Sequence, residues 1–448
     1  MDSLKALLAL DEDQKRARGV VHTPGEIAAQ PALWRETAAG MLAHRERLAG
    51  LLDGVTRVVL TGSGSSYYVG KGLERALSHR LGLPVDAVPG TEIVMDPEGT
   101  LPRQPFLLVS FARSGESPEG NAAFELADRL REGLVRQVAV TCNPEGTLAR
   151  LAQETPSPAA CCLLPPATHD RGLAMTSSFT SMFVASLFLG WTDDPEGYLR
   201  LVERLAQAGQ RILDEYDEPI SQLARKPLER VFFVGSGALF GAALEAHLKV
   251  QELSDGVVLG KAEDTLGLRH GPMAAINEKT LFGLFASAHP YRRRYETDLL
   301  REVDQKGLGL ARLVVCPHPE PEWEALADVV VAFDRDQKLR LPDAITPPLA
   351  VVVGQLLALH KSLALGLTPD RPSRKGVINR VVQGVHIYPY PAGASVGGVR
   401  GERRGLGFRP RYGAVERGSR GPSRDPLLVS KTLAPRAPTG PSAPVGPT

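Results

Sequence analysis

The strongest constraint on the fold is an internal repeat. The segment RVVLTGSGSS, residues 57–66, returns in nearly the same form as RVFFVGSGAL, residues 230–239, an offset of 173 positions. Each copy runs from an apolar stretch through a Gly-Ser-Gly turn into a helical pattern, which is typical of a buried strand followed by a helix. A repeat at this distance indicates one domain that has been duplicated.

Strands and helices alternate after both copies, and the two strand series correspond in order. LLVSFA and VAVTCN follow the first copy, and LFGLFA and LVVCPH follow the second. Such alternation predicts a parallel sheet with both faces covered by helices. We therefore expect an α/β protein with two tandem doubly wound domains. The expected parts are an N-terminal helical segment (1–52), a first domain (53–215), a second domain (216–390) and a C-terminal tail (391–448).

The charge is unevenly distributed, although the net charge is only +1. The tail carries ten basic and three acidic residues among many Gly and Pro, and its weak apolar periodicity predicts disorder. A basic tail can also attract RNA or another polyanion, but it holds few aromatic residues for that purpose.

Four cysteines without ligand spacing indicate reduced thiols. The N-terminus lacks the pattern of a secretory leader, and no apolar run is clean enough to span a bilayer. We therefore expect a cytoplasmic protein.

Two serine-rich turns should lie on one rim of the first domain, because ligands of open α/β sheets sit beyond the carboxyl ends of the strands. Together the turns hold five serines, three glycines and one arginine. Backbone N–H groups at helix starts and small hydroxyl donors suit a phosphate monoester. The candidate phosphate-binding residues are Ser63, Gly64, Ser65, Ser66, Arg113, Ser114, Gly115 and Ser117. Neither turn is GxxxxGK[ST], so the pattern gives no reason to expect a nucleoside triphosphate.

Two other interpretations of these turns remain open. Ser-Gly turns can simply join a strand to a helix. The GSG turn with Asp86 downstream also imitates a dinucleotide-binding pattern, but Tyr67 stands at the third glycine position. Asp86 lies in LPVDAVPG, where we expect an alternating strand to bury it.

The second copy lacks the Ser-Gly-Glu-Ser turn and carries different candidates. Glu245, Lys249 and Glu252 fall on one helix face, and His270 stands in a Gly-Pro loop. From spacing alone, the three charges can be a solvated stripe, and a loop histidine is often exposed and idle.

In combination, these motifs resemble the sugar isomerase (SIS) family. GSGSSY, SGES, the second GSG with a helix ending in LKxxE, and HGP are similar to the isomerase half of glutamine–fructose-6-phosphate aminotransferase. FARSGESPE, RGLAMTSSFTSM, LRHGPM and NRVVQGVHIYPY resemble more closely the galactosamine-6-phosphate deaminase/isomerase branch, also called tagatose-6-phosphate ketose/aldose isomerase. The resemblance covers roughly residues 20–390.

The resemblance implies roles for individual residues. Ser65, Ser66, Ser114 and Ser117 would hold the phosphate, and Glu252 would move a proton between C1 and C2 of the open-chain sugar. His270 would open the ring from a neighbouring subunit, which implies a homodimer or a higher homo-oligomer. Gln383 stands where the aminotransferase has a Schiff-base lysine, so imine chemistry through that position is not expected. Neither a metal nor an organic cofactor is implied.

Three functions follow as hypotheses. The first is deaminating isomerisation of an amino-sugar 6-phosphate, with galactosamine 6-phosphate as the expected substrate, Glu252 as the base and Lys249 steadying the enediol oxygen. The second is aldose–ketose isomerisation without deamination. The third is a sugar-phosphate-sensing regulator. Glu252 and His270 argue against this hypothesis, because an effector pocket does not need them.

Overall fold

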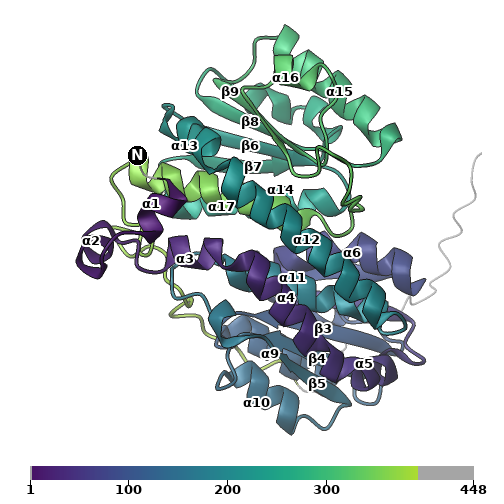
Figure 1. The fold of residues 1–448 in the computed structure, drawn as a ribbon. Helices are drawn as coiled ribbons and strands as arrows, with labels where there is room; N and C mark the ends of the chain where they lie inside the picture. Colours follow the sequence, from purple (N-terminus) through teal and green to yellow (C-terminus); the bar gives the residue numbers. More distant parts are fainter. Residues whose placement is uncertain (1–2, 392–448) are drawn as a thin grey trace, which may run out of the picture. The chain divides into compact units, whose positions relative to one another are not determined.

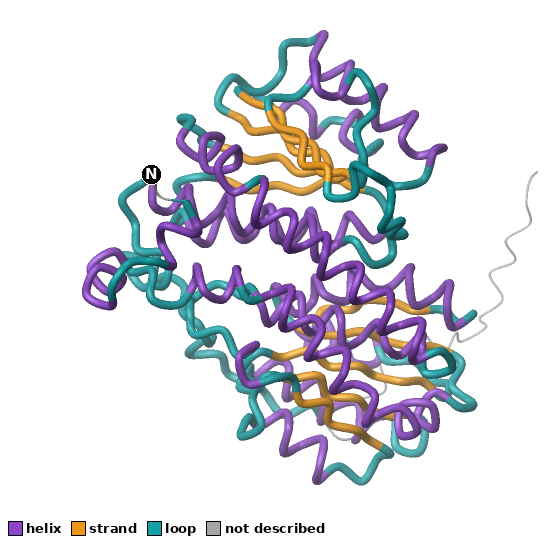
Figure 2. The backbone as a smooth tube through the Cα atoms, in the orientation of Figure 1, coloured by secondary structure: helices purple, strands orange, loops and turns teal. Residues whose placement is uncertain are grey.

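Apolar runs that are buried on both faces form two five-stranded parallel sheets in the computed structural model, which describes residues 3–391 (Figure 2). The predicted tail lies outside the described residues, apart from Pro391. All of the described residues, 3–391, belong to one compact unit.

The first sheet has the order β2-β1-β3-β4-β5, and its neighbouring strands pair in parallel. Its strands are β1 (Arg57–Gly62), β2 (Val85–Pro89), β3 (Phe106–Ala112), β4 (Val135–Thr141) and β5 (Ala159–Leu163). The helices between them are α6 (Ser65–Leu81), α7 (Gly90–Met95), α8 (Pro97–Thr100), α9 (Pro118–Leu130) and α10 (Thr147–Glu154). Central strands β1 and β3 are almost wholly buried, as continuous apolar strands under helices on both faces should be.

The second sheet has the order β10-β9-β8-β6-β7, with parallel pairing throughout. Its strands are β6 (Arg230–Gly235), β7 (Leu259–Glu263), β8 (Thr280–Phe285), β9 (Ala311–Cys316) and β10 (Val329–Ala332). Its helical elements are α14 (Ala238–Leu253), η4 (Gly267–Arg269), η5 (Pro272–Ala275), α15 (Pro290–Gln305), α16 (Trp323–Leu326) and α17 (Pro347–Ala364).

Numbered within each copy, both sheets have the same strand order, 2-1-3-4-5. This confirms the predicted fold class of two tandem doubly wound parallel sheets. The boundaries at residues 52, 215 and 390 stay a prediction.

Helices from both copies pack between the two sheets (Figure 1). Helix α14 packs against α6 of the first copy and against α17. One apolar cluster accordingly includes strand residues of both sheets, such as Val58 and Val231. The two copies therefore share a core, and their strand–helix turns are held in a fixed relation.

The remaining helices lie at the N-terminus and between the two sheets in the sequence. They are α1 (Leu4–Leu8), α2 (Glu12–Arg18), α3 (Thr23–Ala28), α4 (Gln30–Met41), η1 (Leu42–His44), α5 (Arg45–Leu52), η2 (Pro166–Thr168), α11 (Ser177–Leu187), η3 (Phe188–Trp191), α12 (Pro195–Glu215) and α13 (Asp217–Arg225). Among the described residues, α17 is the one helix long and apolar enough to cross a membrane, and 89% of it is buried inside the protein, as in a core helix.

Candidate functional site

A cavity of about 130 Å³ lies where β1 and β3 end. In a sheet of order 2-1-3-4-5, the connections leave β1 and β3 in opposite directions, so a crevice opens between their carboxyl ends. Residues at the starts of α6 and α9 also line the cavity. Two helix N-termini facing one cavity favour an anion there.

Glycines with positive φ give the loops their shape. Gly64 precedes α6 with φ 56° and ψ −126°, and Gly237 takes nearly the same conformation before α14, with φ 63° and ψ −124°. Gly115 has φ 71°, and a Cβ there would lie 3.2 Å from Gly146 Cα. These left-handed turns therefore suit glycine, and the repeated Gly-Ser-Gly is a repeated backbone geometry.

The cavity wall carries hydroxyl groups that make no hydrogen bond to any residue between 3 and 391. Thr61 and Ser110 line the cavity and are only 2% and 3% exposed. Their hydroxyls and that of Ser63 are buried without a hydrogen-bond partner among the described residues. Buried hydroxyls are normally paired, so this wall is built to meet a polar ligand.

Sequence reasoning missed Thr61 and Ser110. The available signal was a polar residue near the end of each otherwise apolar strand, VVLTG and FLLVSFA.

The structure gathers most of the predicted phosphate-binding residues at this cavity. Ser63, Ser66, Arg113, Ser114 and Ser117 line it. Ser117 also caps α9, and its Oγ accepts a hydrogen bond from Gly120 N at 3.5 Å.

Three predicted residues are absent from the described cavity lining. Gly64 and Gly115 shape the turns, whereas the Oγ of Ser65 accepts a hydrogen bond of 2.9 Å from Lys249 Nζ.

Arg113 lies at the cavity but is already engaged with the backbone. Its Nη1 donates to the carbonyl oxygens of Gly172 (3.2 Å) and Leu173 (2.9 Å), and its Nη2 donates to that of Arg380 (2.7 Å). Burial lowers the pKa of the guanidinium from its ordinary value. Arg113 therefore brings a partly desolvated cation to the cavity and holds two loops around it.

The charged face of α14 is buried, which excludes the solvated stripe. Lys249 Nζ lies 3.2 Å from Glu245 Oε1 and 2.5 Å from Glu252 Oε2, and Glu245 and Lys249 are fully buried. Burial raises the pKa of Glu245 to about 7. Burial alone would lower the pKa of Lys249, but the two carboxylates raise it above its ordinary value. The chain Ser65–Lys249–Glu252 thus joins the first copy's turn to the second copy's carboxylate.

His270 and Gln383 lie apart from this cluster. His270 is exposed at the end of η4 and is not among the residues that line the cavity. Gln383 lines a neighbouring hollow of about 450 Å³ together with Arg380 and Val381.

In the second copy, the loop after β8 binds a carboxylate of the protein itself. The loop after β8 is one residue shorter than the loop after β3, and His289 caps α15 where Ser117 caps α9. The carboxylate of Asp343 accepts hydrogen bonds from Ala288 N (2.6 Å), the Ser287 hydroxyl and Arg292 Nη1 (2.7 Å). An internal carboxylate therefore sits at the second copy's loop.

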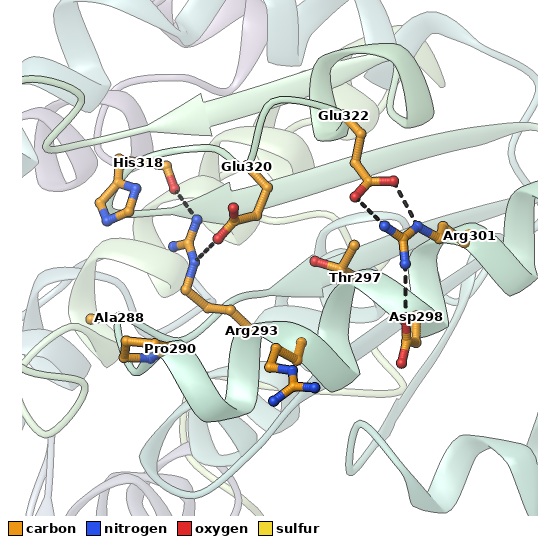
Figure 3. Close-up of a pocket in the computed structure, with 10 residues that line it drawn as sticks. Ala288, Pro290, Arg293, Thr297, Asp298, Arg301, His318, Glu320 and Glu322 are labelled. Atoms are coloured by element: carbon orange, nitrogen blue, oxygen red, sulfur yellow. Dashed lines mark hydrogen bonds and ion pairs between the residues drawn. The ribbon is translucent and has the colours of Figure 1, made fainter. Parts of the chain in front are cut away.

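A larger hollow of about 490 Å³ lies along α15, and its charges neutralise one another (Figure 3). Arg301 makes two bonds to the Glu322 carboxylate, of 2.7 and 2.6 Å, and Arg293 Nε donates to Glu320 at 2.5 Å. These two guanidiniums are paired within the protein. Within residues 3–391, none of the buried side-chain atoms that lack a hydrogen-bond partner belongs to a residue that lines this hollow.

The expectation that Asp86 is buried was wrong. Its side chain is 50% exposed and pairs with Arg57 at 2.8 Å. The reason is that β2 is an edge strand, so Asp86 is not enclosed by neighbours on both sides.

Comparisons with known proteins agree with this geometry. The SIS domain family matches residues 51–190. A protein of Streptomyces coelicolor that is provisionally named D-galactosamine-6-phosphate deaminase AgaS is 43% identical over 389 residues, which cover 82% of this chain and 95% of that protein. D-galactosamine-6-phosphate deaminase AgaS of Escherichia coli is 35% identical, covering 83% of this chain and 96% of that protein.

A solved structure resembles the whole fold. The crystal structure from Clostridium novyi, of a protein provisionally named tagatose-6-phosphate ketose/aldose isomerase, has a TM-score of 0.81 and 33% identity. The match covers 87% of this chain and all of that chain. The similarity therefore extends over both sheets and the helices between them.

Proposed function

Because the chain belongs to the D-galactosamine-6-phosphate deaminase family of SIS proteins, we propose that it converts D-galactosamine 6-phosphate and water into tagatose 6-phosphate and ammonia. The observation that carries the proposal is the anion-suited cavity of the first copy, connected through Lys249 to Glu252. The galacto configuration follows from the names of the relatives.

The cavity between β1 and β3 would take the phosphate. Arg113, the serine hydroxyls and two helix N-termini supply donors and positive potential, and the unpartnered Thr61 and Ser110 hydroxyls add two more donors. Binding this remote group would fix the reacting carbons relative to α14.

Glu252 would then act on the open-chain sugar as the base. Its carboxylate removes the C2 proton, and the electron pair moves so that C1 and C2 form an enaminol, with Lys249 stabilising negative charge that develops on the C1 oxygen. Protonation of C1 by the same carboxylic acid gives a ketimine at C2. Water adds to C2 and ammonia leaves, which yields the ketose 6-phosphate. Every step is a proton transfer, the addition of water or the loss of ammonia, so the proposal requires no organic cofactor.

A second candidate is aldose–ketose isomerisation without loss of nitrogen. The name of the Clostridium novyi protein favours it. The same carboxylate would move the same proton on a 2-hydroxy sugar phosphate.

The proposal includes a homodimer, or a higher homo-oligomer, in the cytoplasm. The exposed position of His270 suits a histidine that opens the ring in a neighbouring subunit's site. The four cysteines, all within the described residues, are unpaired, as expected for a reducing compartment.

Ammonia release tests the proposal. The purified full chain is given D-galactosamine 6-phosphate, with D-glucosamine 6-phosphate as a comparison and tagatose 6-phosphate to detect plain isomerisation. We expect ammonia from the galacto substrate and a loss of kcat of about 100- to 10,000-fold in Glu252→Gln, because the amide cannot accept the C2 proton. Isothermal titration should show that Glu252→Gln still binds the substrate.

The matched control is Glu229→Gln, which changes an exposed carboxylate paired with Lys279 and should leave kcat within twofold. Turnover that survives in Glu252→Gln would remove Glu252 as the base. Interconversion of tagatose 6-phosphate without ammonia from any amino sugar would favour the second candidate.

A further inference from the structure

The phosphate cavity is bordered by a segment that lies far from it in the sequence. Arg380, Val381 and Val382 line the cavity together with the loops of the first sheet. They belong to residues 379–391, here called the C-terminal strap, which follows α17 and contains no helix or strand. The strap therefore takes its position from side-chain contacts.

Arg380 joins the strap to the rim of the first sheet. Its Nε and Nη2 donate to the carbonyl oxygen of Asp170 at 2.9 and 2.6 Å. Its own carbonyl oxygen accepts the 2.7 Å bond from Arg113 Nη2. The two arginines are thus interlocked: Arg113 holds the backbone of Arg380, and Arg380 holds the loop behind Arg113.

Arg113 and Arg380 both line the cavity, and each guanidinium has one nitrogen that makes no hydrogen bond within the described residues. Among residues 3–391, no hydrogen bond engages Arg113 Nε or Arg380 Nη1. The nearby Asp170 carboxylate is already occupied by the backbone and hydroxyl groups at the start of α11, namely Thr176, Ser177 and Ser178.

Two like charges beside one partly dry cavity repel each other. Burial lowers the pKa of Arg113, and the positive charge of Arg380 adds to that lowering, against the opposing effect of Asp170. An anion between the guanidiniums would relieve the repulsion and use the free donors.

We propose that Arg380 is a substrate-binding residue that shares the phosphate with Arg113, so that the strap closes over a loaded cavity. The inference rests on the proposed function for the identity of the sugar, but its anion chemistry rests on the cavity alone. The rival explanation is that Arg380 is only a structural clasp, holding the strap through the Asp170 carbonyl.

Calorimetric titration of the full chain separates the two explanations. The first variant is Arg380→Met, which keeps a long side chain without its charge. The second is Arg380→Lys, which keeps the charge without the planar guanidinium group. The ligands are inorganic phosphate and D-galactosamine 6-phosphate. Loss of a charge-assisted hydrogen bond should weaken both about 10- to 100-fold in Arg380→Met. Arg380→Lys should recover part of the affinity.

The control variant is Arg374→Met, which removes an arginine of the preceding segment that bonds the carbonyls of Leu365 and Gly366 and does not line the cavity. Its phosphate affinity should stay within twofold of the native chain. Unphosphorylated D-galactosamine, tested by competition, should bind Arg380→Met as it binds the native chain, because the lost contact is to the phosphate.

Unchanged phosphate affinity in Arg380→Met would overturn the inference. Equal losses for phosphorylated and unphosphorylated sugar would overturn it too, because they would identify a clasp. The titrations need no turnover. A native chain that binds phosphate through Arg380 but releases no ammonia would refute the proposed function and leave the inference standing.

Discussion

The ammonium group of Lys249 is buried, and its charge is balanced by other groups of the protein. Two carboxylates of its own helix and one hydroxyl of α6 surround its ammonium group at 2.5 to 3.2 Å. Removing one partner of such a buried cluster leaves an uncompensated charge, which is strongly destabilising. Lys249 therefore fixes the direction of the Glu252 carboxylate and balances the negative charge of its two carboxylate partners.

Glu26 is a further carboxylate near the site, and it is partly buried. Its Oε1 accepts hydrogen bonds from Arg171 N (2.5 Å) and Gly172 N (3.2 Å), while its Oε2 is buried without a partner among the described residues. Burial first, and then the negative charge of Asp170, raises the pKa of Glu26 from 4.5 to about 7. Glu26 thus ties α3 to the loop that Arg113 also holds.

We expect Glu26→Gln to change how stability depends on pH. Between about pH 4.5 and pH 7 the folded chain holds a proton on Glu26 that the unfolded chain has lost, so this group's contribution to the free energy of unfolding falls as pH rises. Glutamine keeps an acceptor oxygen and cannot ionise. Relative to the native chain, the variant should therefore gain on the order of 3 kcal/mol between pH 5 and pH 8.

Urea denaturation at several pH values in this range measures the difference. Glu46→Gln, at an exposed position of α5, is the control and should give a difference that does not vary with pH. A flat difference for Glu26→Gln would contradict the assignment of the buried carboxylate.

At the scale of elements, the crossing of α6 and α14 sets the distance between the cavity of the first copy and the charged cluster on α14. Helix α14 approaches so closely that a Cβ at Gly241 would lie 2.3 Å from Gly72 N and 2.5 Å from Gly72 Cα. Backbone atoms cannot yield cheaply to such a contact. The same approach allows Lys249 to reach Ser65.

Gly241→Ala should push the two helices apart. We expect a loss of about 1–3 kcal/mol in the free energy of unfolding, which is typical of overpacking, and a lower kcat through displacement of Lys249 and Glu252. Denaturant unfolding and the ammonia assay measure the two effects. Gly40→Ala, in α4 with no atom within 4 Å of the added Cβ, should instead be neutral or stabilising by up to about 1 kcal/mol. Equal stability of the two variants would argue against the close crossing.

Local sequence patterns were sufficient to predict the strands and helices and the serine-rich turns at the rim of the first sheet. The repeated strand–turn–helix predicts two sheets of one topology, and the topology places Ser63, Ser66 and Ser114 at one crevice. Contacts across the sequence were not predictable in this way. Lys249 meets Ser65 across 184 positions, and Arg113 meets Arg380 across 267. Such pairs arise from how the two copies pack, which periodicity does not encode.

At the scale of the whole molecule, the repeat gives two crevices of the same topology, and within residues 3–391 unpartnered buried hydroxyls lie at the first of them. The first leaves Thr61, Ser63 and Ser110 without partners, whereas the second supplies its own anion, Asp343, from a loop 55 positions after Ala288. The shorter loop after β8 and this carboxylate are the physical reasons for the difference between the two crevices.

Asp343→Ala should therefore expose the second crevice's donors. The Ser287 hydroxyl, Ala288 N and Arg292 would lose their acceptor, and we expect a loss of about 1–3 kcal/mol in the free energy of unfolding. Added formate, a small carboxylate, should restore part of this loss in thermal unfolding and have less effect on the native chain, because binding to the folded state raises stability. Asp336→Ala removes an exposed aspartate of the same loop, paired with Arg211 and Lys338, and should change stability by no more than about 0.5 kcal/mol. If formate acts equally on the native chain and on Asp343→Ala, then Asp343 does not stand in for a bound anion, and the closure of the second crevice must come from the shortened loop alone.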